Sequence, residues 1–136
     1  MPPTHYVVLD RTLFYPEGGG QLGDQGQIGN SRVVDTRIEG DVIFHLTDSE
    51  VSLGKVSGEV SWERRSQLMD HHTAVHIVGG SSRALLGPHI WQAGSSKGFR
   101  YARIDLTHHS RLSREELNRI EAVSYTHLTL PTICSV

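Results

Sequence analysis

The sequence predicts an α+β fold, in which a small antiparallel β-barrel comes first and a two-layer core follows. The core would consist of a long helix, a short antiparallel sheet and a second helix. Two observations lead to this expectation. Residues 1–60 are rich in Val, Ile, Thr and Gly and read as short strands between turn signals, as in small barrels and meanders. Residues 61–122 instead contain stretches with apolar residues at helical spacing.

The first part contains four candidate strands. They span residues 6–14, 33–38, 42–46 and 51–60. The first is stopped by Pro16 to Gln21, because three consecutive glycines cannot hold a regular strand. Glu39-Gly40-Asp41 is typical of a hairpin turn between the second and third.

A long helix is predicted from Trp62 to Leu86. Ser61 can cap its start, and Gly87-Pro88 ends it. Gly79-Gly80 in its interior costs about 1 kcal/mol per glycine relative to alanine, which is tolerated where another element packs closely.

The remainder of this part predicts two strands and a helix. The strands are expected at residues 90–92 and 101–106, joined by a loop through residues 94–98. Ser113 and Glu116 form a capping box that opens the helix.

The last fourteen residues, 123–136, contain no Asp, Glu, Lys or Arg, and they interrupt the apolar periodicity of the second helix. An apolar residue is expected near positions 124 and 127, but Ser124 and His127 stand there. The stretch 123–132 resembles the translation of a sequencing adapter. We therefore expect residues 123–136 to be a non-native tail that packs poorly; a genuine uncharged terminal strand is the alternative.

The composition is that of a globular protein, with 37% hydrophobic and 21% charged residues. Thirteen basic and fifteen acidic side chains give a net charge of −2, which excludes a generally basic nucleic-acid binder. No apolar run is long enough to span a membrane. The single cysteine, Cys134, excludes an internal disulfide, so a cytoplasmic protein is expected.

His72 and His76 are four residues apart on the long predicted helix, so both rings should project from one face. This spacing suits two ligands of one zinc ion, although such a pair is more often solvated than metal-bound. Thr73 follows the first histidine where a metalloprotease needs Glu, which disfavours that chemistry.

Gly18, Gly19, Gly20 and Gln21 form the second notable segment. Glycines let a ligand approach the backbone and offer N–H donors, although three glycines alone favour a tight turn. No Gly-Lys-Ser/Thr follows, so the segment is not a phosphate-binding loop.

Together these segments resemble the editing domain of alanyl-tRNA synthetases, nearest the archaeal branch, and the related free-standing alanyl-tRNA editing proteins. The similarity covers nearly all of residues 6–122. Its motifs occur at residues 9–12, 18–26, 72–77, 85–87, 89–95, 103–108 and 113–117.

The resemblance implies hydrolysis of tRNA(Ala) mischarged with serine or glycine, with the acceptor end of the tRNA as partner. A pocket for alanine cannot strongly reject glycine or serine, because such differences give only about 1–3 kcal/mol of discrimination, so a second sieve is needed. The resemblance also implies that Thr12 recognises the serine hydroxyl, that Gly18 to Gln21 adjoin the substrate, and that Gln92 lines the pocket. No catalytic residue is assigned.

The resemblance further implies that His72 and His76 are zinc ligands. The family's other ligands come from a Cys-x-x-x-His segment that this sequence lacks, so the zinc site is expected to be incomplete. The sequence also lacks the aminoacylation domain, so ATP would bind only in the full-length synthetase. We therefore expect a truncated fragment that is inactive by itself.

Two alternatives stay open. One is a free-standing editing hydrolase truncated at its C-terminus. The other is a non-catalytic RNA-binding module with a local basic patch. The candidate basic residues are Arg64, Arg65, Arg83, Lys97, Arg100 and Arg103.

Overall fold

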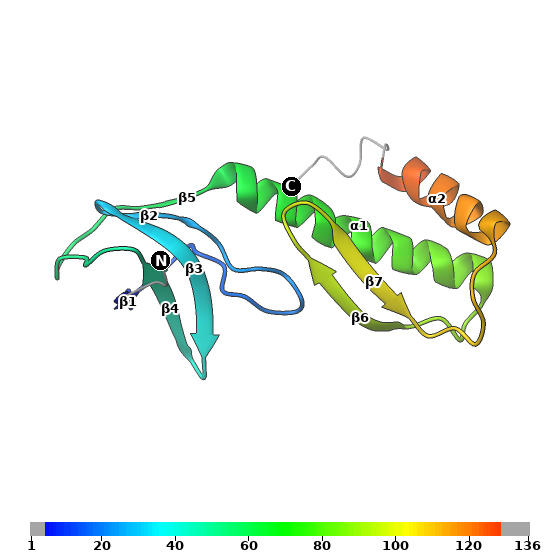
Figure 1. Cartoon of the computed structure of the whole chain (residues 1–136), viewed down its shortest axis with the longest axis horizontal. Coiled ribbons are helices and arrows are strands. Elements are labelled where there is room, and N and C mark those ends of the chain that lie inside the picture. Colours follow the sequence, from blue (N-terminus) through cyan, green and yellow to red (C-terminus); the bar gives the residue numbers. More distant parts are fainter. Residues whose placement is uncertain (1–4, 129–136) are drawn as a thin grey trace. The chain divides into compact units, whose positions relative to one another are not determined.

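The computed structural model describes residues 5–128. The chain divides into two compact units, residues 1–69 and 70–136, and the boundary falls inside helix α1 (Trp62–Leu86). Each unit is described by itself below. Figure 1 shows the strands of the first unit and the helices and hairpin of the second.

The first unit is built around one antiparallel sheet. Its strands are β1 (His5–Val7), β2 (Gly26–Ile28), β3 (Ser31–Glu39), β4 (Val42–Thr47) and β5 (Gly58–Val60). The strand order is β1-β4-β3-β2-β5, and the two edge strands do not pair with each other. The predicted closed barrel is therefore wrong for the described residues. β1 and β5 have three residues each, too few to close a sheet on itself.

Most of the strand predicted at residues 6–14 is a loop, because side chains there bond to the neighbouring backbone. The hydroxyl of Thr12 accepts the N–H of Phe14 at 3.0 Å, and Asp10 accepts the N–H of Arg11 at 2.9 Å. Such local bonds compete with a strand ladder. Only His5–Val7 pairs with β4.

The predicted hairpin is confirmed as β3 and β4. Glu39 pairs with Val42 across a turn in which Gly40 has a φ of 59°. That left-handed conformation suits glycine and matches the twist of the flanking strands.

Phe14, Ile28 and Val33 form the buried core of the first unit. Two glycines let its backbones approach closely. A Cβ on Gly23 would lie 2.2 Å from the carbonyl oxygen of Thr36, and one on Gly26 would lie 2.0 Å from that of Glu59. No side chain fits at either position, which explains the glycines in Gly23-Asp24-Gln25-Gly26.

Helix α1 is confirmed at both ends. The carbonyl of Ser61 accepts the N–H of Arg65, which places Ser61 at the helix cap. Gly87, with a φ of 119°, donates to the carbonyl of Arg83 and ends the helix.

The second unit contains the part of α1 beyond Met69, a hairpin of β6 (Gln92–Lys97) and β7 (Ala102–Leu106), and helix α2 (Arg114–Leu128). The predicted loop at residues 94–98 is wrong, because residues 94–97 pair with β7. Gly94 lies opposite Asp105, where a Cβ would come within 2.9 Å of the carboxylate.

The two interior glycines of α1 have different surroundings. A Cβ on Gly79 would lie 3.1 Å from the Cδ1 atom of Ile104, whereas nothing lies within 4 Å of the corresponding position on Gly80. α1 therefore packs against β7 at Gly79, as the tolerated glycine pair predicted.

The capping box of α2 is confirmed. Ser113 donates its N–H to the Glu116 carboxylate at 2.8 Å, and Glu116 donates its N–H to the Ser113 hydroxyl at 3.2 Å. The expected break near residue 123 is wrong, because α2 continues to Leu128 and Ser124 is buried with 4% exposure. Residues 129–136, including Cys134, lie outside the described part.

Candidate functional site

Thr12 and His45 form a hydrogen-bonded pair in the first unit. The Thr12 Oγ1 atom lies 2.8 Å from His45 Nε2, although the residues are 33 positions apart in sequence. His45 is fully buried in β4, with the ring of Phe14 packed against it edge-on. Thr12 is half-buried in the loop after β1.

The partners of His45 determine where its proton lies. Nδ1 is 2.9 Å from the carbonyl oxygen of Val7, which can only accept, so Nδ1 carries the hydrogen. Burial lowers the pKa of His45 below its ordinary 6.5, and the bond to Val7 opposes this change. The ring is therefore neutral at pH 7, and its bare Nε2 accepts the hydroxyl hydrogen of Thr12.

This arrangement fixes the hydrogen-bonding capacity of Thr12. A hydroxyl has one hydrogen and two lone pairs. The hydrogen is donated to His45, and one lone pair accepts the N–H of Phe14. The oxygen keeps a second lone pair as an acceptor of defined direction.

The residues Gly18 to Gln21 form a two-residue turn. Gly18 and Gln21 exchange backbone hydrogen bonds of 3.1 and 3.0 Å, and Gly19 and Gly20 have φ values of 59° and 78°. Positive φ at both central positions is typical of a type I′ turn. The tight turn favoured for the glycines alone is therefore present. Gln21 is buried, with 4% exposure.

Arg65 holds both ends of the segment from Leu13 to Asp24, which contains this turn. Its guanidinium donates to both carboxylate oxygens of Asp24, which is fully buried, and to the carbonyl of Leu13 at 2.7 Å. Asp24 also accepts the N–H of Tyr15 at 2.7 Å. Sequence reasoning missed this ion pair, since only tertiary structure brings residues 41 positions apart together.

Five of the six candidate RNA-binding cations are engaged within the chain, and one of them, Arg103, forms an exposed ion pair with Asp105 at 3.2 Å. Arg64 donates to the carbonyl of Gly23, and Arg65 pairs with Asp24. Lys97 is buried and donates to Ser95 at 2.7 Å, and Arg83 lies 3.9 Å above the ring of Trp91. These contacts weaken the interpretation as a basic RNA-binding patch.

His72 and His76 project from one face of α1 in the second unit, as predicted. Their rings are stacked, with centroids 5.1 Å apart and planes inclined by 22°. Burial lowers the pKa of His72 below 6.5, and the charges of Lys97 and His76 lower it further. A neutral imidazole is the form that binds metals.

The pair fits zinc in donor chemistry but not in number. Within residues 5–128, no third His, Cys, Asp or Glu side chain joins them in a group able to share one ion. Protein zinc sites have three or four protein ligands, so His72 and His76 leave at least one ligand to be supplied from elsewhere.

Gln92 lies exposed at the start of β6 and donates to the Ser95 hydroxyl at 3.1 Å. It belongs to the second unit with His72 and His76, whereas Thr12 and Gly18 to Gln21 belong to the first. A pocket that combines the two groups stays a prediction.

Comparison with known proteins places the first unit in a family. Residues 3–64 match the family model of class II tRNA synthetases (A). This part of the chain is therefore similar to class II tRNA synthetases.

The longer matches are more specific. The alanine--tRNA ligase of Metallosphaera sedula is 51% identical over 126 residues, that of Ignicoccus hospitalis 51% over 125, and that of Sulfurisphaera tokodaii 48% over 125. These alignments cover 86–88% of this chain but 14% of each relative. The sequence is thus homologous to a segment of archaeal alanine--tRNA ligases, which confirms the noted resemblance to that family. That the segment is the editing domain stays a prediction.

Neither described helix has the length and apolar character needed to cross a membrane.

Proposed function

We propose that this chain is the part of an alanine--tRNA ligase that removes wrong amino acids from tRNA(Ala), by hydrolysing the ester of seryl- or glycyl-tRNA(Ala). The homology to alanine--tRNA ligases supports the tRNA partner. The geometry of Thr12 supports seryl-tRNA(Ala) as a substrate. The proposed reaction belongs to the cytoplasm, and ATP would be used only by the aminoacylation part of a full-length ligase.

The hydrogen-bonding state of Thr12 is the observation that carries the proposal. The Thr12 hydroxyl donates its hydrogen bond to His45, and one of its lone pairs accepts the backbone N–H of Phe14. Its Oγ1 atom can therefore meet a ligand only as an acceptor. A seryl side chain can donate its O–H to that acceptor, whereas the methyl group of alanine cannot. Thr12 would thus favour serine over alanine, the direction that editing requires.

A second site is needed because the first cannot discriminate well enough. An alanine pocket distinguishes a substrate that differs by one small group by only about 1–3 kcal/mol. The second site must prefer the wrong amino acid, whereas the first prefers alanine. A hydrogen bond that only serine can donate to Thr12 gives this preference, because alanine leaves the Thr12 oxygen without a donor. The glycine turn and Gln92 would each contact the substrate.

His72 and His76 would hold zinc together with ligands from a Cys-x-x-x-His segment. A bound zinc ion would supply a Lewis acid beside the ester. The two histidines alone are too few, so we expect the 136-residue chain to hydrolyse seryl-tRNA(Ala) slowly or not at all.

The test is deacylation of seryl-, glycyl- and alanyl-tRNA(Ala) by two proteins: the chain as it stands, and the chain extended by the following segment of the Metallosphaera sedula relative. The extended protein should hydrolyse seryl- and glycyl-tRNA and spare alanyl-tRNA. Thr12→Val should slow hydrolysis of seryl-tRNA about five- to tenfold more than that of glycyl-tRNA, because only serine uses the hydroxyl.

Thr126→Val is the matched control, since it changes an exposed threonine on α2 and should leave both rates unaltered. Equal loss on both substrates in Thr12→Val would contradict the proposed role of Thr12. Hydrolysis of alanyl-tRNA at the rate of seryl-tRNA would contradict editing itself.

A further inference from the structure

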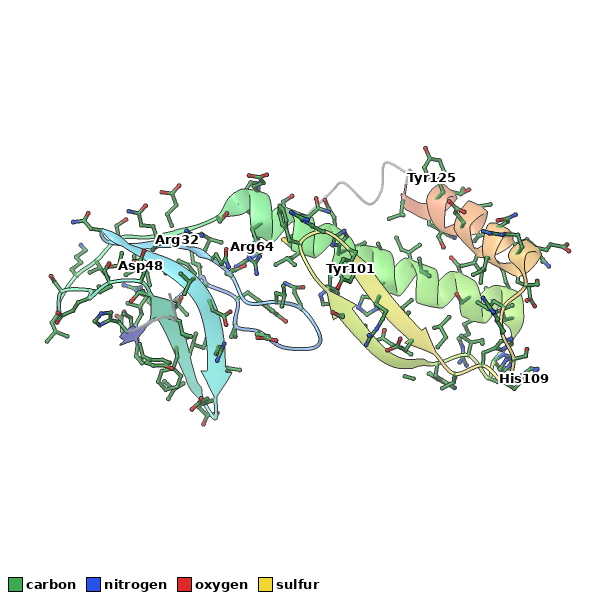
Figure 2. All side chains as sticks on the ribbon, in the orientation of Figure 1. Arg32, Asp48, Arg64, Tyr101, His109 and Tyr125 are labelled. Carbon is green, nitrogen blue, oxygen red and sulfur yellow. The ribbon has the colours of Figure 1, made fainter. Side chains whose placement is uncertain are left out.

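Three histidines meet at one end of the second unit, away in sequence from His72 and His76. His89 lies in the connection from α1 to β6, and His108 and His109 lie in the connection from β7 to α2. Each offers a ring nitrogen, and the three nitrogens all lie within 4.8 Å of one another. Figure 2 shows His109 where these two connections meet. Among the described residues, this is the one group of three or more possible metal ligands.

The backbone beneath the cluster is fixed by Thr107. Its N–H donates to the carbonyl of Trp91 at 2.9 Å, and its hydroxyl donates to the carbonyl of His89 at 2.7 Å. The N–H of Trp91 donates back to that hydroxyl at 2.8 Å. Three hydrogen bonds thus tie the connection that carries His89 to the residue that precedes His108.

The ring orientations of His89 and His108 direct one nitrogen of each toward the other. His89 Nε2 lies 2.9 Å from His108 Nδ1, and the rings are stacked at 5.1 Å. The opposite edge of His89 faces Gly87, where a Cβ would come within 3.2 Å of Nδ1. Glycine at position 87 therefore leaves room for the ring in this orientation. His108 Nε2 faces the Ser110 hydroxyl at the longer distance of 3.4 Å.

We propose that His89, His108 and His109 form a binding site for a divalent transition-metal ion of the zinc class, separate from the His72–His76 pair. In a tetrahedral zinc site with bonds near 2.0–2.1 Å, neighbouring nitrogens are about 3.3 Å apart. The nitrogens of the His89–His108 pair need to separate by a few tenths of an ångström, and their rings need to turn so that both lone pairs face the ion instead of each other. His109, whose ring centroid is 4.6 Å from that of His108, needs to turn inward.

The donor set indicates what the site would bind and how. Three imidazoles suit zinc, copper and nickel rather than magnesium or calcium, which prefer oxygen ligands. Three protein ligands leave the fourth position of a tetrahedral ion to water. His89 and His109 are exposed, so the ion would reach the site directly from solvent.

The first experiment is a zinc titration by calorimetry with the whole chain in a His72→Gln/His76→Gln background, which removes the other pair of donors. We expect one zinc ion per chain. Adding His109→Gln should weaken binding about tenfold or more, because one of three ligands is lost. Adding His127→Gln, which removes an exposed histidine on α2, should leave the affinity unchanged.

Circular dichroism without zinc checks that the variants remain folded. In the unmodified chain, zinc should shift the imidazole nitrogen resonances of His89 Nε2 and His108 Nδ1 in NMR spectra, a readout that needs no substitution. Failure of the background protein to bind zinc, an unchanged affinity in His109→Gln, or unshifted resonances at His89 and His108 would each overturn the proposal.

Discussion

The hydroxyl of Thr12 donates its hydrogen to Nε2 of His45 across 2.8 Å, and the opposite nitrogen of His45 is held by the carbonyl of Val7 at 2.9 Å. A residue exposed enough to meet a ligand is thereby oriented by a fully buried one. The same hydrogen bond should therefore affect both the free energy of unfolding of the first unit and the proposed preference for seryl-tRNA(Ala).

Thr12→Val should destabilise the first unit by about 1–3 kcal/mol, because the valine leaves the buried Nε2 of His45 without its donor. Urea unfolding, followed by a probe in the first unit, measures this change. Thr126→Val on α2 removes an exposed hydroxyl that donates to the carbonyl of Ala122, and should cost less. An equal loss in both variants would show that His45 does not depend on Thr12.

The stability of the first unit should fall as the pH is lowered. Burial depresses the pKa of His45 in the folded state below its unfolded value of 6.5. Below pH 6.5 the unfolded chain therefore binds more protons than the folded chain. The stabilisation is fully present above pH 6.5 and is lost as the pH falls through the folded pKa.

Urea midpoints measured from about pH 8 to about pH 5 test this dependence, since histidine titrates in that interval. His45→Asn retains an N–H that can reach the Val7 carbonyl but cannot be protonated. It should be less stable at high pH, and its midpoint should vary less with pH. If the urea midpoint of His45→Asn changed with pH as steeply as that of the unmodified chain, the pH dependence would have to come from other histidines.

Gly80→Ala should stabilise the chain by about 0.5–1 kcal/mol, because alanine restricts the unfolded backbone and meets nothing within 4 Å in the folded state. Gly79→Ala is the matched control. It has the same gain in helix propensity, but its Cβ would lie 3.1 Å from Ile104, so it should stabilise less or destabilise. Thermal unfolding compares the two, and a larger gain for Gly79→Ala would contradict the packing of α1 on β7.

Ser124→Ala should stabilise the second unit by about 1 kcal/mol. The Ser124 Oγ atom is buried and has no hydrogen-bond partner within the described structure, and such a group costs free energy that a methyl group does not. Thr126→Ala provides the comparison, because it makes a similar change on the exposed face of α2. Thermal unfolding of both variants measures the difference; a Ser124→Ala protein that melts earlier would indicate a partner for the hydroxyl.

Ser124 also bears on the tail. Helical periodicity predicted that position 124 should be apolar, and the structure places it on the buried face of α2. The expectation that residues from 123 onward pack poorly is wrong for Ser124, which is buried. The expectation that position 124 faces the apolar side of the helix is correct, although a serine stands there. That residues 123–136 are non-native stays a prediction, which the nucleotide sequence of this region can test.

Local chemistry in the sequence determined the helix ends, the β3–β4 turn and the placement of His72 and His76. Ser61, Gly87 and the Ser113–Glu116 capping box act on their own backbone neighbours, so their effects can be read without knowing the fold. The spacing of His72 and His76 likewise fixes a shared helix face. The motifs were specific enough to identify the relationship to alanine--tRNA ligases.

Only tertiary structure decided which strands pair and which side chains meet. The strand predicted at residues 6–14 is cut short because a side chain in the loop before Phe14 accepts a hydrogen bond from the loop's own backbone, and the sheet stays open. Residues 94–97 form a strand because they pair with β7. His45, Arg65 and the cluster of His89, His108 and His109 carried no sequence signal of their roles. Their partners lie 19 to 41 positions away, and contacts over such separations depend on how the chain folds back on itself rather than on any local pattern.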